Sequence, residues 1–158
     1  MAGALVLGAL GAAAGDWPHF RGPKCDGICP ETGLLKEWPA NGPSLLWTAT
    51  GVGKGYSSVS NVGGKLFTMG DLRTDDGERQ HVIALDLATQ KVVWTAKVGA
   101  PHGDGSRCTP THDDGLLYAV GTDGDVVCVQ AADGKEVWRK NFGKDFGGRM
   151  MSGWKYSE

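Results

Sequence analysis

The side chains that could do chemistry in this sequence are loop aspartates, two histidines and four cysteines. Eight aspartates stand beside glycine or other polar residues: Asp71, Asp75, Asp76, Asp104, Asp113, Asp114, Asp123 and Asp125. Carboxylates in such stretches usually bond to the backbone of their own turn. His102, in Pro-His-Gly-Asp, and His112, in Thr-His-Asp-Asp, stand alone, whereas a metal site needs several converging ligands. We therefore predict no catalytic residue and no metal site.

The cysteines offer one candidate pair. Cys25 and Cys29 flank the turn-forming Asp26-Gly27-Ile28, and a small disulfide loop is one interpretation of them. A zinc ligand pair is the other, although no second pair follows at zinc-like spacing. Cys108 and Cys128 are expected on strands with a third strand between them, a separation beyond disulfide reach.

Composition excludes several classes of protein. The 158 residues carry 16 Lys and Arg against 18 Asp and Glu, with both signs scattered, so the basic stripe of a nucleic-acid-binding protein is missing. After the N-terminus, no stretch is apolar enough to span a membrane. The 26 glycines are spread along the chain beside Val, Leu, Tyr and Trp, which is typical of short strands joined by tight turns.

An internal repeat organises these strands. Residues 84–99, ALDLATQKVVWTAKVG, align with residues 128–143, CVQAADGKEVWRKNFG. Trp94 and Trp138 are 44 residues apart, and Trp47 precedes Trp94 by 47 residues. A period of about 40 to 50 residues is typical of propeller blades that are built from four strands each.

The repeat divides the chain into six expected stretches. They are a signal peptide (1–15), a Pro/Gly-rich segment (16–43), an orphan outer strand around Trp47 (44–54), a first blade repeat (55–106), a second blade repeat (107–144) and the start of a third (145–158). Strands are expected near 57–62, 65–70, 80–86 and 91–97, and again near 108–112, 116–121, 125–130 and 135–140. Residues 71–79, DLRTDDGER, are predicted to form a polar loop.

The phrase at residues 84–94 resembles the tryptophan-docking motif of PQQ-binding-like β-propeller repeats. It departs from that motif at Gln90, where the family prefers glycine. Residues 128–138 keep Gly134 and Trp138, with Gln130 in place of the motif's Asp. The opening Trp17-Pro18-His19-Phe20-Arg21-Gly22-Pro23 also resembles secreted members of this family, whereas neither repeat ends in the Trp-Asp of WD40 proteins.

The resemblance implies an all-β fold, a β-propeller of four-stranded antiparallel blades, with about two complete blades and an incomplete ring in this chain. A Trp near the end of an outer strand can lie across the next blade and bury roughly 150–250 Å². At about 25 cal/mol per Å² this burial would contribute several kcal/mol. The residues expected to have this structural role in the repeats are Trp47, Trp94, Trp138, Asp86 and Gly134.

The N-terminus indicates export. Leu5 to Leu10 is a short apolar run, and Ala12-Ala13-Ala14-Gly15 supplies small residues for cleavage, as in a signal peptide, although no Lys or Arg precedes the run. A disordered Ala/Gly extension is the alternative. We expect a periplasmic or secreted protein.

Two functions follow from the resemblance. The favoured one is a non-catalytic scaffold without a cofactor, which presents loops to an unidentified protein or small ligand, as an outer-membrane assembly lipoprotein with the same repeat does. The alternative is the N-terminal part of a PQQ-dependent dehydrogenase, which would hold PQQ and Ca²⁺ with active-site residues outside this chain. In either case further blades are expected from a C-terminal continuation, because a propeller needs about four to eight blades to close.

Overall fold

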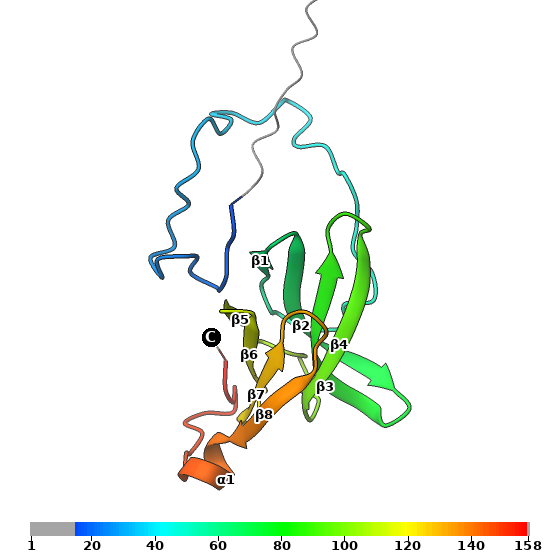
Figure 1. Ribbon diagram of the computed structural model, residues 1–158, viewed down its shortest axis with the longest axis vertical. Helices are drawn as coiled ribbons and strands as arrows, with labels where there is room; N and C mark the ends of the chain where they lie inside the picture. Colours follow the sequence, from blue (N-terminus) through cyan, green and yellow to red (C-terminus); the bar gives the residue numbers. More distant parts are fainter. Residues whose placement is uncertain (1–14, 158) are drawn as a thin grey trace, which may run out of the picture.

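The computed structural model describes residues 15–157, and over this range the chain forms two four-stranded antiparallel sheets (Figure 1). The strands of the first sheet are β1 (Ser60–Val62), β2 (Lys65–Thr74), β3 (Gly77–Asp86) and β4 (Lys91–Gly99). Those of the second are β5 (Thr111–Asp113), β6 (Leu116–Val120), β7 (Asp125–Gln130) and β8 (Glu136–Asn141). Each strand pairs with the next along the chain, as in a propeller blade.

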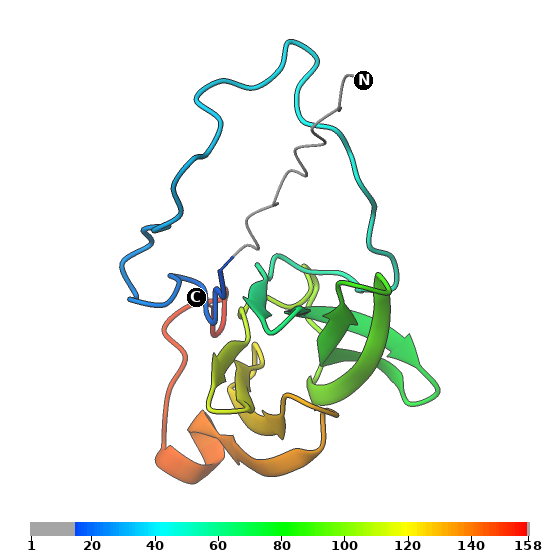
Figure 2. The same cartoon turned by 45° about the horizontal axis from the view of Figure 1, so that its top comes forward.

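The predicted all-β class and its two four-stranded blades are confirmed, and the described residues close no ring. The short helix α1 (Phe142–Phe146) follows β8, and no described helix has the length and apolar character that crossing a membrane requires. In Figure 2 the segment before β1 makes a wide arch away from the sheets. The predicted signal peptide falls outside the described residues, apart from Gly15.

The two sheets share one register. In the first sheet Phe67 of β2 pairs with Ala84 of β3, which pairs with Trp94 of β4. In the second sheet the corresponding row is Tyr118, Cys128 and Trp138. A register shift directly follows Ala84 in β3 and Cys128 in β7. The repeated sequence therefore specifies the same sheet twice, down to its irregularity.

The turns before the outer strands also correspond. Gly134 has a φ of +75°, a left-handed conformation that glycine adopts without steric cost. Gln90 stands at the equivalent position and adopts a φ of +59°. Asp86 Oδ1 accepts hydrogen bonds from the Thr89 amide and hydroxyl, at 2.7 and 2.8 Å. These bonds lower the pKa of Asp86 below its ordinary value, so Asp86 helps to hold a turn that lacks the preferred glycine.

The core lies between the two sheets. Val82 and Val98 from the first sheet and Leu117, Val127 and Val129 from the second belong to one cluster of buried apolar side chains. In β4, exposed residues such as Val93 alternate with more buried ones such as Trp94, because an outer strand turns only one face to the core. β2 and β3 carry continuous runs of buried residues instead, because these central strands are covered on both faces.

Trp94 reaches from the first sheet to the turn of the second. A Cβ added to Gly134 would lie 2.5 Å from Cε3 of the Trp94 ring, so the ring lies directly against the glycine backbone. Trp94 also packs against Phe67, with ring centroids 6.0 Å apart. Trp138, in contrast, is 41% exposed. Of these two tryptophans, Trp94 is therefore the one that can stabilise the contact between the sheets.

Polar groups also join the sheets. The buried Gln80 side chain donates to Thr122 Oγ1 and accepts from the Thr122 amide, both at 3.0 Å. Arg139 of β8 donates to the Lys97 carbonyl at 2.7 Å and to the Val98 carbonyl, both in β4. Because buried polar groups are costly unless they are paired, these bonds favour one alignment of the sheets.

The predicted polar loop at residues 71–79 is wrong. β2 and β3 continue as a regular hairpin through Arg73, paired with Glu78, and Thr74, paired with Gly77. The connection consists of Asp75 and Asp76 alone. Opposite charges on paired residues favour the extension, and the polar character of the sequence reflects a hairpin tip that extends into solvent.

The strand expected at 44–54 is not formed either. In the described structure these residues contribute only an isolated bridge between Lys54 and Asp71, and Trp47 is partly exposed outside any strand. A strand needs a neighbour for its backbone groups, and residues 44–50 have no such neighbour here. Residues 145–157 contain the end of α1 and no strand. The segment of the first repeat that they are matched to, residues 55–57, also precedes its first strand, so the start of a third repeat stays a prediction.

We predict that Trp94→Ala lowers the free energy of unfolding by about 3–5 kcal/mol, because a large side chain is removed from the contact between the sheets. Trp138→Ala is the matched control and should cost less, since Trp138 is more exposed. Urea denaturation measures both. A loss below about 1 kcal/mol for Trp94→Ala would contradict the assigned role.

We also predict opposite effects at the two equivalent turns. Gln90→Gly should stabilise the protein by about 0.5–1 kcal/mol, because the strain of a left-handed residue exceeds the added entropy of the unfolded chain. Gly134→Ala should destabilise it by at least about 2 kcal/mol, because it adds the same strain and a clash with Trp94. Thermal unfolding measures the stability of the two variants. Equal changes in stability would contradict the packing of Trp94 against Gly134.

Candidate functional site

The connecting segments before β1, before β5 and after α1 meet around a hollow of about 490 Å³. Tyr56, Asp104, Arg107, Trp154 and Ser157 line it, and we call it the Arg107 hollow. Tyr56 precedes β1, Asp104 and Arg107 lie between β4 and β5, and Trp154 and Ser157 follow α1. The site is thus assembled from three segments that are distant in the sequence.

Backbone bonds hold two of these segments together. Lys54 and Asp71 exchange backbone hydrogen bonds of 3.2 and 2.8 Å, and the Tyr56 amide donates to the Ser106 carbonyl at 2.7 Å. The approach is close, because a Cβ on Gly70 would lie 1.9 Å from the Val52 carbonyl oxygen. Only glycine allows the segment before β1 to pass this near to β2.

A buried carboxylate completes this junction. Asp71 is 4% exposed, and its two oxygens accept from the Ser106 hydroxyl at 2.6 Å and from the His102 amide at 2.8 Å. The turn role that the sequence predicted for Asp71 is wrong, since the residue lies in β2 and joins it to residues 102–106. Both oxygens are used within the protein, so Asp71 positions the loop.

Arg107 is the central side chain of the hollow. Its side chain is 12% exposed, and Nη2 donates to Asp104 Oδ2 at 2.7 Å. The guanidinium carbon lies 5.1 Å from the centre of the Trp154 ring, which is a cation–π geometry. Its Nε is buried without a hydrogen-bond partner. A carboxylate and an aromatic ring therefore fix the position of the Arg107 guanidinium, and its buried Nε is not accessible to a ligand.

The other predicted residues do not converge on this hollow. The His102 ring accepts from the Asp104 amide at 3.2 Å, and the His112 ring stacks on Phe67 at 6.2 Å. Across residues 15–157, no group of three or more His, Cys, Asp or Glu side chains could hold a metal ion. Sequence reasoning missed the hollow because only the fold brings its segments together.

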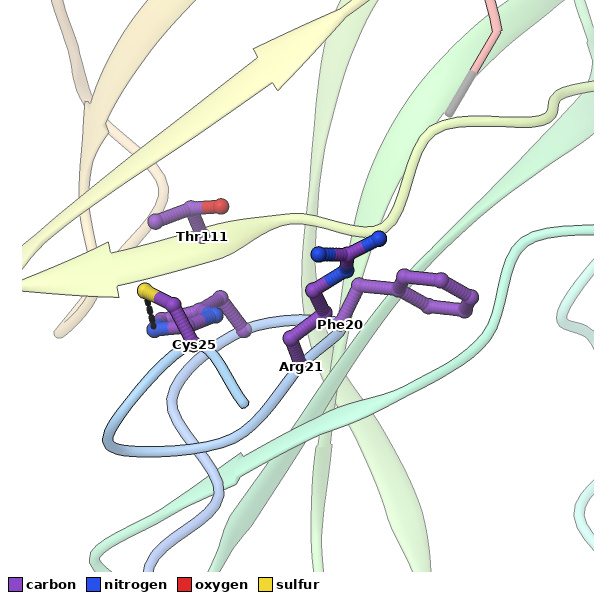
Figure 3. A pocket seen from close by; sticks show the side chains of 5 residues that line it. Phe20, Arg21, Cys25 and Thr111 are labelled. Atoms are coloured by element: carbon purple, nitrogen blue, oxygen red, sulfur yellow. Dashed lines mark hydrogen bonds between the residues drawn. The ribbon is translucent and has the colours of Figure 1, made fainter. Parts of the chain in front are cut away.

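The structure does not form the candidate Cys25–Cys29 disulfide, and both residues are exposed free thiols. Cys25 Sγ instead lies 3.4 Å from His19 Nε2 (Figure 3). The turn at Cys25 directs its side chain toward His19, which is six residues earlier in the chain. Sequence reasoning weighed Cys25 and Cys29 as a disulfide or as a zinc ligand pair, and it missed this neighbour. In the sheets, by contrast, burial raises the pKa of the Cys128 thiol.

Comparison with known proteins gives one family match. Residues 78–152 match the family model described as outer membrane protein assembly factor BamB. The match confirms the resemblance to PQQ-like β-propeller repeats for the segment from β3 to beyond α1. No curated protein matches the chain.

Similar solved structures include two dehydrogenases and a BamB. A europium-containing methanol dehydrogenase is 21% identical, with 62% of this chain and 18% of that chain covered and a TM-score of 0.49. The quinohemoprotein alcohol dehydrogenase from Comamonas testosteroni is 21% identical, with 60% of this chain and 14% of that chain covered and a TM-score of 0.46. BamB from Moraxella catarrhalis is 17% identical, with 60% of this chain and 26% of that chain covered and a TM-score of 0.40. The chain thus spans 26% or less of the length of these proteins.

We predict that Asp71→Ala lowers the free energy of unfolding by about 3 kcal/mol, because it leaves the Ser106 hydroxyl and the His102 amide without their buried acceptor. Asp75→Ala, at the exposed hairpin tip, is the matched control and should change it by less than about 0.5 kcal/mol. Chemical denaturation measures both. Equal stabilities would show that the buried carboxylate does not hold this junction.

Proposed function

We propose that this chain is part of an exported, non-catalytic propeller protein that binds another protein through the Arg107 hollow. The observation that carries the proposal is the combination of side chains there. Tyr56 is 77% exposed and Trp154 is 66% exposed, and they flank an arginine that is already fixed in position. Trp, Tyr and Arg are the residues most enriched among those that dominate binding energy at protein interfaces.

The rigidity of the hollow also supports this role. Asp71, the glycine contacts and the bond between Tyr56 and Ser106 hold two of the three segments, those before β1 and before β5, on the first sheet. Little conformational entropy is then lost when a partner binds, which favours affinity. Small-molecule sites are concave and bury most of their ligand, whereas the two aromatic side chains here are largely exposed. The hollow therefore suits a protein surface better than a small molecule. A protein segment with an apolar side chain would suit the two exposed rings.

The family match adds context to this proposal. The matched model is described as an outer membrane protein assembly factor. We propose that this protein acts in the periplasm or outside the cell, which the predicted signal peptide also favours. Family likeness alone does not assign a function.

The alternative function is a PQQ-dependent dehydrogenase. A PQQ site of that kind also holds Ca²⁺, which takes six to eight oxygen ligands. The described residues do not fit this requirement, because they offer no group of three or more His, Cys, Asp or Glu side chains. Asp104 in the hollow is already paired with Arg107, and Asp71 is buried and fully bonded. We therefore derive no catalytic step from this chain.

Site-specific cross-linking tests the binding role. A photoreactive amino acid at position 56 should cross-link one partner protein in the producing cells, whereas the same amino acid at exposed position 91 on β4 should not. With the partner purified, Arg107→Ala or Trp154→Ala should weaken binding by about 2 kcal/mol, or roughly thirtyfold. Lys91→Ala is the matched control. Unchanged affinity of both hollow variants would refute the proposed surface.

Addition of PQQ and Ca²⁺ to the full-length protein, which would include the further blades that the alternative requires, tests the alternative. We expect no bound-quinone absorbance and no alcohol- or sugar-dependent dye reduction, with a purified quinoprotein dehydrogenase as the positive control. Stoichiometric quinone binding with dye reduction would favour the dehydrogenase. Because it needs no partner protein, this measurement separates the two functions.

A further inference from the structure

A thiol and an imidazole are in contact on the turn that precedes the sheets. Cys25 Sγ lies 3.4 Å from His19 Nε2, and Cys25 is exposed to solvent (Figure 3). This pair is separate from the Arg107 hollow and has no part in the proposed binding function. A thiol that touches an imidazole can transfer its proton as the sulfur becomes a nucleophile.

The turn that carries the pair is fixed on the sheets. Trp17 exchanges two backbone hydrogen bonds with Asn61, at 2.7 and 2.8 Å, and the His112 amide donates to the Pro18 carbonyl at 2.7 Å. The Trp17 ring also lies against Gly22, where an added Cβ would be 2.5 Å from the ring. His19 and Cys25 are thus held by contacts to both sheets.

Bonds within the turn bring the two side chains together. The Gly22 amide donates to the His19 carbonyl at 2.9 Å, and the Cys25 amide donates to the Gly22 carbonyl at 3.0 Å. This double turn folds residues 19–25 back on themselves. The thiol and the imidazole therefore meet through backbone geometry.

A hollow of about 360 Å³ adjoins the pair. His19, Phe20, Arg21, Cys25 and Thr111 line it (Figure 3). Arg21 brings a positive charge, Thr111 of β5 a hydroxyl, and Phe20 an exposed ring. These groups suit a small molecule that carries a carboxylate and an apolar part, with its reactive atom next to Cys25.

We propose that Cys25 is a thiol–disulfide exchange site for small disulfides that carry a carboxylate, with His19 as its base and Arg21 as its anion-binding residue. Cys25 Sγ attacks one sulfur of the disulfide R–S–S–R while His19 Nε2 accepts the thiol proton. A new S–S bond forms to Cys25 and the original S–S bond breaks. The leaving thiolate takes the proton from His19 and departs as R–SH. The Cys25 thiol is thereby oxidised to a mixed disulfide, and one half of the small disulfide is reduced to a thiol.

The other cysteines serve as internal references. Cys29 is exposed four residues further along the same segment, and within residues 15–157 no hydrogen bond joins it to a histidine. Cys128 is buried, and its burial raises the pKa of the thiol, which disfavours the reactive thiolate. Cys25 should therefore react first with a disulfide reagent.

The experiment measures the rate at which the 158-residue chain reacts with dithiobis-nitrobenzoate, an aromatic disulfide that carries carboxylates. Released nitrothiobenzoate gives the rate, and peptide mapping of the mixed disulfides assigns it to individual cysteines. Cys25 should react at least about tenfold faster than Cys29 in the same molecule. This comparison needs no variant, so it holds even if a substitution impairs folding.

Variants then separate the roles of the neighbours. His19→Gln should slow the reaction of Cys25 at least about fivefold, toward the rate of Cys29, both with dithiobis-nitrobenzoate and with the neutral disulfide dithiodipyridine. Arg21→Gln should slow the reaction with the anionic disulfide but not with neutral dithiodipyridine. Cys29→Ser should leave the rate of Cys25 unchanged, and protection of the buried cysteines should confirm that each variant is folded.

Equal rates for Cys25 and Cys29 in the wild-type chain would overturn the proposal. An unchanged Cys25 rate in a folded His19→Gln variant would also overturn it, because the imidazole would then have no part in the reaction. Equal slowing of both disulfides by Arg21→Gln would remove the anionic specificity and with it the proposed class of ligand.

Discussion

The packing of one sheet against the other is the interaction on which the rest of this structure depends. A four-stranded sheet with two apolar faces is unstable in water unless each face finds a neighbour. Here the facing sides bury Val82 and Val98 against Leu117 and Val127, and Trp94 closes the outer part of the contact over Gly134. Without that burial neither sheet would hold its loops in place.

Polar contacts add precision to this apolar contact. Apolar surfaces alone could slide, since the hydrophobic effect has no direction. The paired bonds between Gln80 and Thr122 and the bonds from Arg139 to β4 are satisfied in one alignment. The same alignment brings residues 102–107 to Asp71 and Tyr56, and so it shapes the Arg107 hollow.

The turn with Cys25 depends on the sheets in a similar way. It is anchored by Trp17 on Asn61 of β1 and by Pro18 on His112 of β5, so it spans both sheets. Both candidate sites in this chain thus lie in connecting segments that two sheets hold together. Irregular segments on a rigid scaffold are where binding and reactive residues are commonly found.

The sequence by itself determined the repeat, the all-β class and most of the strands, because periodic apolar residues and turn residues act over short distances. It also singled out Trp94 and Gly134, whose spacing repeats. Only the tertiary structure decided that β2 extends as far as Thr74 and that β3 begins at Gly77. It also decided that residues 44–50 form no strand and that Cys25 contacts His19 rather than Cys29. It also decided which loops meet around Arg107. The physical reason is that these features depend on contacts between residues distant in the chain or on the exact path of a turn, which local sequence patterns do not encode.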